Sequence, residues 1–453
     1  MKRLFTRSRQ RPEPESVFGR ETPALISLSP PGKGLRRTFT SLRQRNFRLF
    51  WGGQLISLMG SGMQTIGQAW LVLNLTHSAE QLGLVGALQA LPVLLFSLFG
   101  GVFADRWPKR RVLLVTQSAA MMQALLLWLL LATGTLQLWH LYLLALLLGL
   151  TNSLDRPTRQ AFVVEMVGRE DLPNAIALNS SISTLARIAG PGLGGMIIAA
   201  SSVTLLFLLN ALSFLPVLVG LVLIKRSALH TRTSRPVGAG ERQSTWQSLR
   251  EGLNYVWRTP AVLLMILVAG LVLLFGSNFN VVLPLFATDV LHIGAAGFGF
   301  LSAATGLGAL LSALWLAWRN SRPTIRRVLL TMLIFGLLEI CFALSRVYLL
   351  SLILIASIGF TEIAFAELTM TMLQLIAPDH LRGRVMSVCI LFFDGSVPPG
   401  YLLLGWLSGR YGPSIALLIG ALLSLLVAGG GWLGRKPAEK DVAANEGVQG
   451  RLL

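Results

Sequence analysis

Residues 109–133 read KRRVLLVTQSAAMMQALLLWLLLAT. Three basic residues precede an apolar run that is long enough to cross a bilayer, because a helix needs about 20 such residues to span about 30 Å of hydrocarbon. The run is continuous in Leu and Ala and does not alternate in polarity, which excludes a membrane strand. The stretch therefore predicts a membrane-spanning helix with a basic end.

Eleven further stretches have the same character. The twelve predicted spans are 49–73, 82–104, 112–133, 138–158, 176–200, 203–224, 261–286, 298–318, 327–345, 348–372, 385–408 and 414–433. Hydrophobic residues make up 53% of the 453 residues and charged residues only 13%, against about 25% charged in soluble proteins. The composition excludes a soluble protein and a mostly disordered one. We therefore expect an all-α membrane protein embedded in the lipid bilayer.

Lys and Arg residues indicate the orientation of the chain. Of 39 such residues, 36 fall on one side of the predicted spans, two (Arg346 and Arg410) on the other, and Arg187 lies within a span. Basic residues stay on the cytoplasmic side, so both termini are predicted to be cytoplasmic, in a plasma (inner) membrane. The net charge of +19 is then a topology signal and no sign of nucleic-acid binding.

The chain contains an internal repeat. KRRVLL (109–114) returns as IRRVLL (325–330), and LTHSAEQLG (75–83) returns as LHIGAAGFG (291–299), both at an offset of 216. Duplicated halves indicate a transporter whose site lies at the midplane between them and which works by alternating access. We therefore predict two pseudo-symmetric six-helix halves.

The predicted spans and connections divide the chain into five parts. They are a disordered basic cytoplasmic tail (1–45), the N-terminal half (46–224), a cytoplasmic linker (225–259), the C-terminal half (260–434) and a second tail (435–453). Within the linker, Trp246, Leu249, Leu253 and Trp257 recur at helical spacing, which predicts an amphipathic helix at the membrane surface.

Several classes of chemistry find no support. Cys341 and Cys389 lie inside apolar runs, so no disulfide framework is expected. The histidines and cysteines do not cluster, so no metal or other cofactor is predicted. The phosphate-binding pattern Gly-x4-Gly-Lys-Ser/Thr is missing from the sequence. An enzyme is not indicated, and transport has to use an ion gradient or be passive.

The loop GGVFADRWPKRR (100–111) resembles the signature loop of the major facilitator superfamily. The matching residues are Gly101, Asp105, Arg106, Lys109 and Arg110, with Pro108 in place of the usual glycine. The resemblance implies a charged latch that closes the cytoplasmic side in one state, since a carboxylate at a helix C-terminus needs a partner. The alternative is an ordinary basic loop that only fixes orientation.

Residues beyond this loop extend the resemblance. We expect Asp155 and Arg159, with Arg156, to complete the cytoplasmic gate. ARIAGPGLGG (186–195) resembles a signature of export-type members and places Gly190, Pro191, Gly194 and Gly195 at a close helix packing; packing without any directional meaning is the alternative. RNFRLFWGGQLIS (45–57), LPNAIALNSS (172–181) and APDHLRGRVMS (377–387) resemble the branch of enterobactin exporters and macrolide efflux pumps.

The first predicted span carries a polar face. Its members, spaced by three and four residues, are Gln54, Ser57, Ser61, Gln64 and Gln68. Gly53, Gly60 and Gly67 form a neighbouring stripe. We interpret the polar face as the lining of a substrate cavity and the stripe as a packing face; hydrogen bonding within a closed helix interface is the alternative for the polar residues.

Charged residues inside spans are costly and mark functional sites. Arg187 lies near the midplane and is expected to anchor substrate or to pair with a carboxylate. Glu362 and Asp394 are the candidate coupling residues, because burial favours the neutral form of a carboxyl group and hence proton uptake. Glu339 and Glu367 are weaker candidates, and neutral carboxyl groups in a helix interface remain the alternative.

The sequence thus predicts a monomeric secondary transporter that exports small amphiphilic molecules of the drug or siderophore type, coupled to protons. Two alternatives stay open. One is a facilitator or importer of a metabolite or lysolipid on the same fold, and the other is a membrane receptor or scaffold that does not transport. The residues do not identify the substrate.

The charge distribution makes the topology testable. A reporter enzyme that is active only in the cytoplasm, fused after Arg435, should be active, because 36 of the 39 basic residues lie on the same side as this position. A reporter that works only outside the cytoplasm serves as the control at the same position. Activity of the second reporter instead of the first would refute the predicted topology.

Overall fold

The computed structural model describes residues 40–168, 171–225, 227, 229, 245–319 and 323–440, with the backbone alone for 97–106 and 245–249. All of these residues belong to one compact unit, Thr40–Leu453. Every regular element in the described part of the chain is a helix. Most of the two predicted tails falls outside the described residues; within them, residues 40–43 and 435–440 are helical.

The helices follow one another with short connections. In chain order they are η1 (Thr40–Arg43), α1 (Arg45–Thr76), α2 (Ala79–Arg106), α3 (Lys109–Ala132), α4 (Leu138–Val167), α5 (Leu172–Ala200), α6 (Val203–Leu223), α7 (Thr245–Arg258), α8 (Pro260–Phe275), α9 (Phe279–Asp289), α10 (Ala295–Arg319), α11 (Ile325–Leu344), α12 (Tyr348–Ile376), α13 (Arg382–Tyr411) and α14 (Pro413–Leu433).

Eleven stretches of the described chain are long and apolar enough to cross a membrane, with α8 and α9 together forming one of them. Helix α1 is not among the eleven, although it runs unbroken over 32 residues. Its polar face and its basic first turn lower its mean hydropathy. Because α1 lies alongside α5 and α6 over much of its length, we propose that it is the twelfth crossing.

The predicted span 261–286 is not one helix. Helix α8 ends at Phe275, helix α9 begins at Phe279, and Gly276, Ser277 and Asn278 form a break between them. The Asn278 side chain donates a hydrogen bond of 2.7 Å to the Leu274 carbonyl, which the break leaves without its usual helical donor. The apolar run concealed this break, because Gly, Ser and Asn are common in membrane helices.

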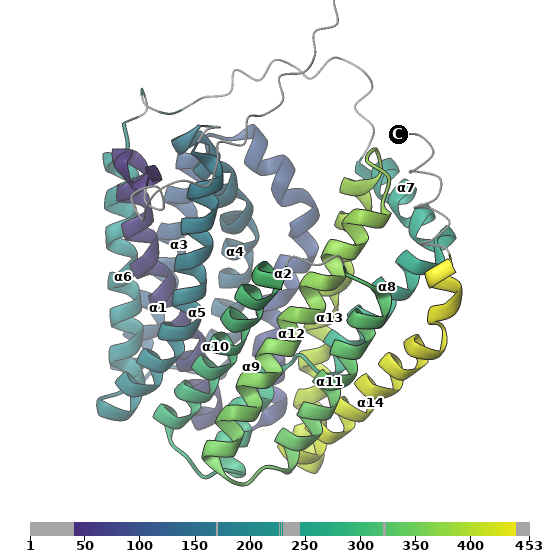
Figure 1. Ribbon diagram of the computed structural model, residues 1–453. Coiled ribbons are helices and arrows are strands. Elements are labelled where there is room, and N and C mark those ends of the chain that lie inside the picture. Colours follow the sequence, from purple (N-terminus) through teal and green to yellow (C-terminus); the bar gives the residue numbers. More distant parts are fainter. Residues whose placement is uncertain are drawn as a thin grey trace, which may run out of the picture. The chain divides into compact units, whose positions relative to one another are not determined.

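The helices form two groups; in Figure 1, α1, α3 and α6 of the first lie on the left and α8, α11 and α14 of the second on the right. In the first group, α1 packs on α5 and α6, α2 on α4, and α3 on α4 and α6. In the second, α10 packs on α12, α11 on α12 and α14, and α13 on α8 and α14. The glycine stripe of α1 faces α6: a Cβ atom at Gly53 would lie 2.6 Å from the Val217 Cα, and Gly60 and Gly67 meet Ser213 and Leu206.

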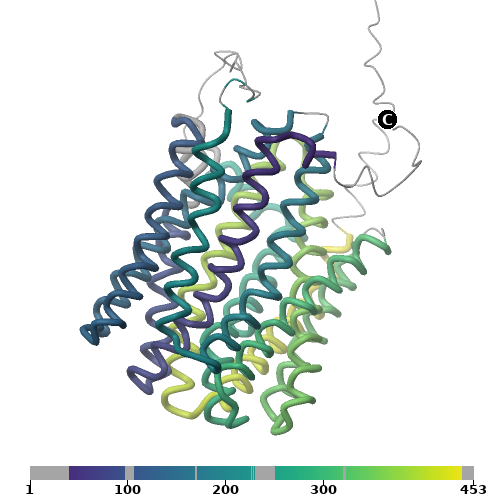
Figure 2. Tube along the Cα trace, turned by 90° about the vertical axis from the view of Figure 1, so that its left-hand side faces the viewer, coloured from purple at the N-terminus to yellow at the C-terminus, as the bar shows by residue number. Residues whose placement is uncertain are grey.

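The long helices run up and down between two ends of the bundle (Figure 2). We call the end that carries the connections 77–78, 133–137, 201–202, 290–294, 345–347 and 412 the hairpin face, and the opposite end, from which α6 leads to α7, the linker face. The two groups meet mainly through α2 with α13 and α5 with α10.

Glycines make these two contacts very close near the hairpin face. A Cβ atom at Gly83 would lie 2.5 Å from the Tyr401 carbonyl oxygen and 3.1 Å from the Gly405 Cα. A Cβ atom at Gly195 would lie 2.5 Å from the Ala295 carbonyl oxygen and 2.9 Å from the Gly299 Cα. Backbone thus packs directly on backbone, which only glycine permits. We call these two contacts, Gly83–Gly405 and Gly195–Gly299, the glycine seal.

The predicted amphipathic helix is present as α7, which packs on α8 and α13. Glu251 forms an ion pair with Arg384 of α13, and Val256 is buried. Leu253 and Trp257, which belong to the predicted apolar stripe, are exposed on the surface of the protein, and Trp257 is 64% accessible. The side chains of Trp246 and Leu249 are outside the described part. An apolar face left open beside a basic segment suits the membrane surface.

The glycine seal predicts a sharp difference between two glycines of α5. Gly195→Ala should lower the melting temperature of the purified protein by about 2–6 °C, because overpacking against rigid backbone costs about 1–3 kcal/mol. Gly192→Ala is the matched control, since its Cβ would meet only Ala303 at an ordinary 3.7 Å and both variants gain the same helix propensity. Equal melting temperatures for the two variants would show that the seal is not tightly packed.

Candidate functional site

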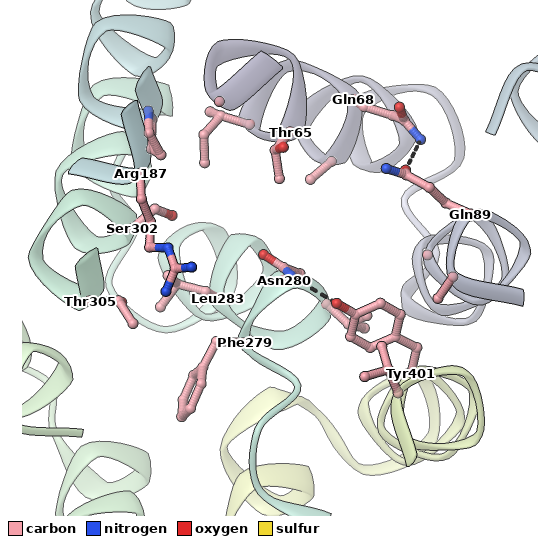
Figure 3. Close-up of a pocket in the computed structure, with 18 of the residues that line it drawn as sticks. Thr65, Gln68, Gln89, Arg187, Phe279, Asn280, Leu283, Ser302, Thr305 and Tyr401 are labelled. Atoms are coloured by element: carbon pink, nitrogen blue, oxygen red, sulfur yellow. Dashed lines mark hydrogen bonds between the residues drawn. The ribbon is translucent and has the colours of Figure 1, made fainter. Parts of the chain in front are cut away.

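A cavity of about 520 Å³ lies where the two helix groups meet. Helices α1, α2, α4 and α5 line it from the first group, and α9, α10, α12 and α13 from the second. Figure 3 shows side chains from both groups pointing into the same space, including Arg187, Gln68 and Asn280. The volume is typical of sites for small molecules, which range from about 300 to 1,000 Å³.

Four charged side chains line the cavity. Arg156 and Arg187 come from α4 and α5, and both are accessible. Glu362 and Asp394 come from α12 and α13 and are half-buried. Arg187 lies close enough to Glu362, and Arg156 to Asp394, for their charges to interact. Among the described residues, however, no hydrogen bond or ion pair within bonding distance joins these groups.

Neutral polar groups fill the spaces between the charges. The Gln68 amide donates a hydrogen bond of 3.2 Å to Gln89, and the Asn280 amide donates one of 2.8 Å to the Tyr401 hydroxyl, both drawn in Figure 3. The first bond joins α1 to α2, and the second joins α9 to α13. Among the described residues, the remaining acceptors and donors of these side chains make no hydrogen bond, so they can contact a ligand.

The polar face of α1 proves to be mostly a helix interface. The Gln64 amide donates to Gln123 of α3 at 2.7 Å and accepts from Asn210 of α6. Ser57 donates to Gln117 of α3 at 3.2 Å. Gln54 is buried, and Ser61 donates to the Ser57 carbonyl. Only Gln68 lines the cavity.

The cavity assignment of Gln54, Ser57, Ser61 and Gln64 is therefore corrected. Spacing along α1 shows which residues share a face but not which helix lies opposite that face. Buried amides need partners, and α3 and α6 supply Gln117, Gln123 and Asn210. This network holds α1 to its own group.

The predicted cytoplasmic gate is only partly described. Only the backbone of Gly101, Asp105 and Arg106 is described. Lys109 forms an ion pair of 2.6 Å with Glu165 at the linker end of α4. The Arg110 guanidinium donates to the Leu221 carbonyl at 2.5 Å and to the Val222 carbonyl at 2.8 Å, which satisfies the last turn of α6.

Asp155 and Arg159 are buried more deeply than predicted. Asp155 forms an ion pair with Arg159 and accepts hydrogen bonds from Thr116 and Gln117 of α3, at 2.9 and 2.8 Å. All four residues belong to the first group. Helix α4 continues to Val167, nine residues past the predicted end at 158, so Asp155 and Arg156 lie within the helix and not at its end.

The helix-5 signature contacts both groups. Gly190 meets the Gly62 Cα, where a Cβ would lie 2.9 Å away, and Gly194 meets Met63 at 3.0 Å, both on α1. Gly195 faces α10 in the glycine seal. Pro191 lines the cavity. The packing motif thus joins α5 to its own group and to the opposite one.

The break between α8 and α9 borders two further carboxyl groups. Ser277 donates a hydrogen bond to Glu362. Glu339 of α11 is 1% exposed, and both of its carboxyl oxygens lie without a hydrogen-bond partner among the described residues. They pack against Gly276, whose Cβ would lie 2.8 and 3.0 Å from them. Glu367, also a candidate, is exposed and does not line the cavity.

Several residues of the cavity were not selected from the sequence. Arg156 was assigned to the gate, whereas it lines the cavity, as do Asn152, Gln89, Asn280 and Tyr401. The predicted span 138–158 ended too early. A predicted helix that reached Val167, as α4 does, would have placed Asn152 and Arg156 near its middle. Gln89 and Tyr401 lie within the predicted spans 82–104 and 385–408, whereas the position of Asn280 depends on the helix break.

Comparison with known proteins fits this architecture. The pattern of the family described as transmembrane secretion effector matches residues 36–446. The chain is 28% identical to the multidrug efflux pump Tap of Mycolicibacterium fortuitum over 384 residues, covering 82% of this chain and 91% of that one. It is 29% identical to the enterobactin exporter EntS of Shigella boydii over 392 residues, covering 84% and 91%.

The fold is also similar to that of a solved transporter. The nucleoside transporter NupG superposes with a TM-score of 0.68 at 13% identity, covering 86% of this chain and 99% of that one. The family pattern spans most of the chain, and the helices, the cavity between two groups and the repeat agree with it. The chain belongs to the transmembrane secretion effector family of the major facilitator superfamily, and it is a multi-pass membrane transporter.

Proposed function

We propose that this protein exports a small amphiphilic molecule of the drug or siderophore type by alternating access. The cavity between the two groups, sealed on one face by glycines, carries this proposal. Relatives named as a multidrug efflux pump and an enterobactin exporter support the direction and the class of substrate. Residues 46–224 and 260–434 are the two halves that rock against each other, and the transporter acts as a monomer.

The linker face is the cytoplasmic face in this proposal, in the inner membrane of a bacterium. The charge distribution supports it, because the basic connections lie at that end. The glycine seal then closes the cavity to the outside, and substrate loads from the cytoplasm or the inner leaflet. A facilitator or importer on the same fold finds no specific support in the contacts described.

Protons supply the energy in this proposal, through Glu362 and Asp394. Both carboxyl groups lie near the middle of their helices, line the cavity and belong to the second half. Arg187 and Arg156 come from the first half and carry opposite charge. Protonation of a carboxyl group removes its attraction to the guanidinium across the cavity, so proton binding changes how strongly the two halves attract each other at the midplane.

The latch at Asp105 is proposed to close the linker face in the opposite state. Lys109 and Arg110 tie the start of α3 to α4 and α6, so the loop moves with the first half as a unit. A carboxylate at the C-terminal end of α2 is disfavoured by the helix dipole. It gains most from a partner on the second half, which rocking brings near and takes away.

Asp105→Asn should lower the rate of transport roughly 5- to 30-fold with normal membrane insertion, because a charged contact of about 1–2 kcal/mol is lost from one state. The measurement is efflux of a fluorescent substrate from cells at matched expression. Asp379→Asn is the control, since this carboxylate lies in another linker-face connection with a side chain 91% exposed. Unchanged efflux in Asp105→Asn would contradict the proposed role of Asp105 as a latch.

The double variant Glu362→Gln, Asp394→Asn should exchange substrate passively but fail to build a gradient, because neither side chain can then carry a proton. Accumulation in inside-out vesicles with an imposed proton gradient measures this, and counterflow measures the passive exchange. Glu367→Gln is the control on the same helix, since this carboxyl group lies outside the cavity. Uphill transport at the wild-type level in the double variant would contradict the coupling assignment.

A further inference from the structure

The charges of the cavity are sorted by helix group. Arg156 and Arg187 come from α4 and α5 of the first group, and Glu362 and Asp394 come from α12 and α13 of the second. One wall of the cavity is therefore cationic and the opposite wall is anionic. The other polar lining residues, among them Gln68, are neutral.

The cationic wall is open to a ligand. Arg187 makes no hydrogen bond or ion pair with any other described residue, and it lines the cavity together with Ser302 and Thr305 of α10, all three labelled in Figure 3. The Ser302 hydroxyl is likewise unbonded within the described chain, whereas Thr305 donates to the Leu301 carbonyl. A guanidinium offers a planar fork of donors that fits a carboxylate or another anionic oxygen group.

The anionic wall is also incompletely occupied. Ser277 donates to one oxygen of Glu362, and the second oxygen has no donor in the described structure. Asp394 accepts no hydrogen bond within the same residues, although it faces the cavity. Two carboxylates with oxygens that lack donors among the described residues are the natural partners of a protonated ligand amine, which has donors only.

The sign of the coupling restricts the ligand further. A purely anionic ligand binds more strongly when Glu362 and Asp394 are protonated, because the cavity then carries the charge of the two arginines alone. By reciprocity such a ligand promotes proton binding and travels in the same direction as the proton. An amine instead competes with protons for the two carboxylates, so that amine and proton exclude each other, as exchange in opposite directions requires.

We propose that the ligand is amphoteric, with an anionic oxygen group held by Arg187 and Arg156 and an amine held by Glu362 and Asp394. This proposal rests on the export function proposed above and names its substrate class. The ligand bridges the two halves, since each of its charged ends contacts a different one. Other charged groups act on these walls: Asp155 and Arg159, which pair with each other, lie near Arg156, and Glu339, packed against Gly276, lies near Glu362. None of the three lines the cavity.

Three probes that share one fluorophore test the ligand class. Nε-dansyl-lysine carries both an amine and a carboxylate, dansylcadaverine carries the amine alone, and N-dansyl-6-aminohexanoate carries the carboxylate alone. Each is titrated by fluorescence into the full-length protein in lipid nanodiscs, without a proton gradient. We expect dansyl-lysine to bind roughly tenfold or more tightly than either of the other two, since it makes both charged contacts.

Variants assign the two ends of the probe. Arg187→Gln should weaken dansyl-lysine and the aminohexanoate roughly tenfold, but it should not weaken dansylcadaverine, whose binding to Glu362 gains from the loss of a nearby cation. Glu362→Gln should weaken dansyl-lysine and dansylcadaverine instead. Arg410→Gln, outside the cavity, is the matched control and should alter none of the three. Arg156→Gln repeats the first test if Arg187→Gln does not fold.

The dependence on pH gives a second readout. Lowering the pH should weaken dansylcadaverine and strengthen the aminohexanoate, because the two carboxyl groups take up protons. Equal affinity for the three probes, no binding of any of them, or an unchanged preference in Arg187→Gln would overturn the ligand class. Any of these results would contradict the ligand class but not the proposed export function. Uphill transport by the Glu362→Gln, Asp394→Asn variant would contradict the proposed proton coupling but not the ligand class.

Discussion

The architecture depends on two places where backbone touches backbone across the molecule. Gly83 meets Gly405 and Gly195 meets Gly299, with no Cβ atom between the helices. Gly83 and Gly299 end the two repeated segments at the offset of 216, so one glycine of each contact occupies the same position of the duplicated unit. Because each contact joins a helix of one group to a helix of the other, the seal sets the distance between the halves and thereby the width of the cavity.

The cavity is polar at a depth where polar groups are costly. Its four charges lie near the middle of long helices, where a bilayer offers no water to solvate them. The protein stabilises them with each other and with the water and ligand that the cavity admits. The asymmetric distribution of charge, cations on one half and carboxylates on the other, gives the midplane an attraction that a proton or a ligand can modify.

Much of the fold follows from the sequence, because length, apolar runs and basic flanks are local properties. The helices, the repeat and the positions of Arg187, Glu362 and Asp394 follow from such patterns, and the family assignment agrees with them. Which helix packs against a given helix face is not a local property of the sequence. The polar face of α1 was expected to line a cavity, yet two of its residues, Ser57 and Gln64, form hydrogen bonds with α3, and Gln64 also with α6. The break at Gly276–Asn278 and the continuation of α4 also depend on tertiary contacts, and they decide that Asn280 and Arg156 reach the cavity.

The glycine seal and the cavity lining are separate sets of residues, and this separation affects how the protein can evolve. The seal excludes every side chain, so its four positions have almost no freedom to change. The lining consists of side chains around an open space of about 520 Å³, where a replacement alters shape or charge without moving a helix. A new substrate can therefore be acquired by substitutions in the lining alone, while the apparatus that opens and closes the transporter is inherited unchanged.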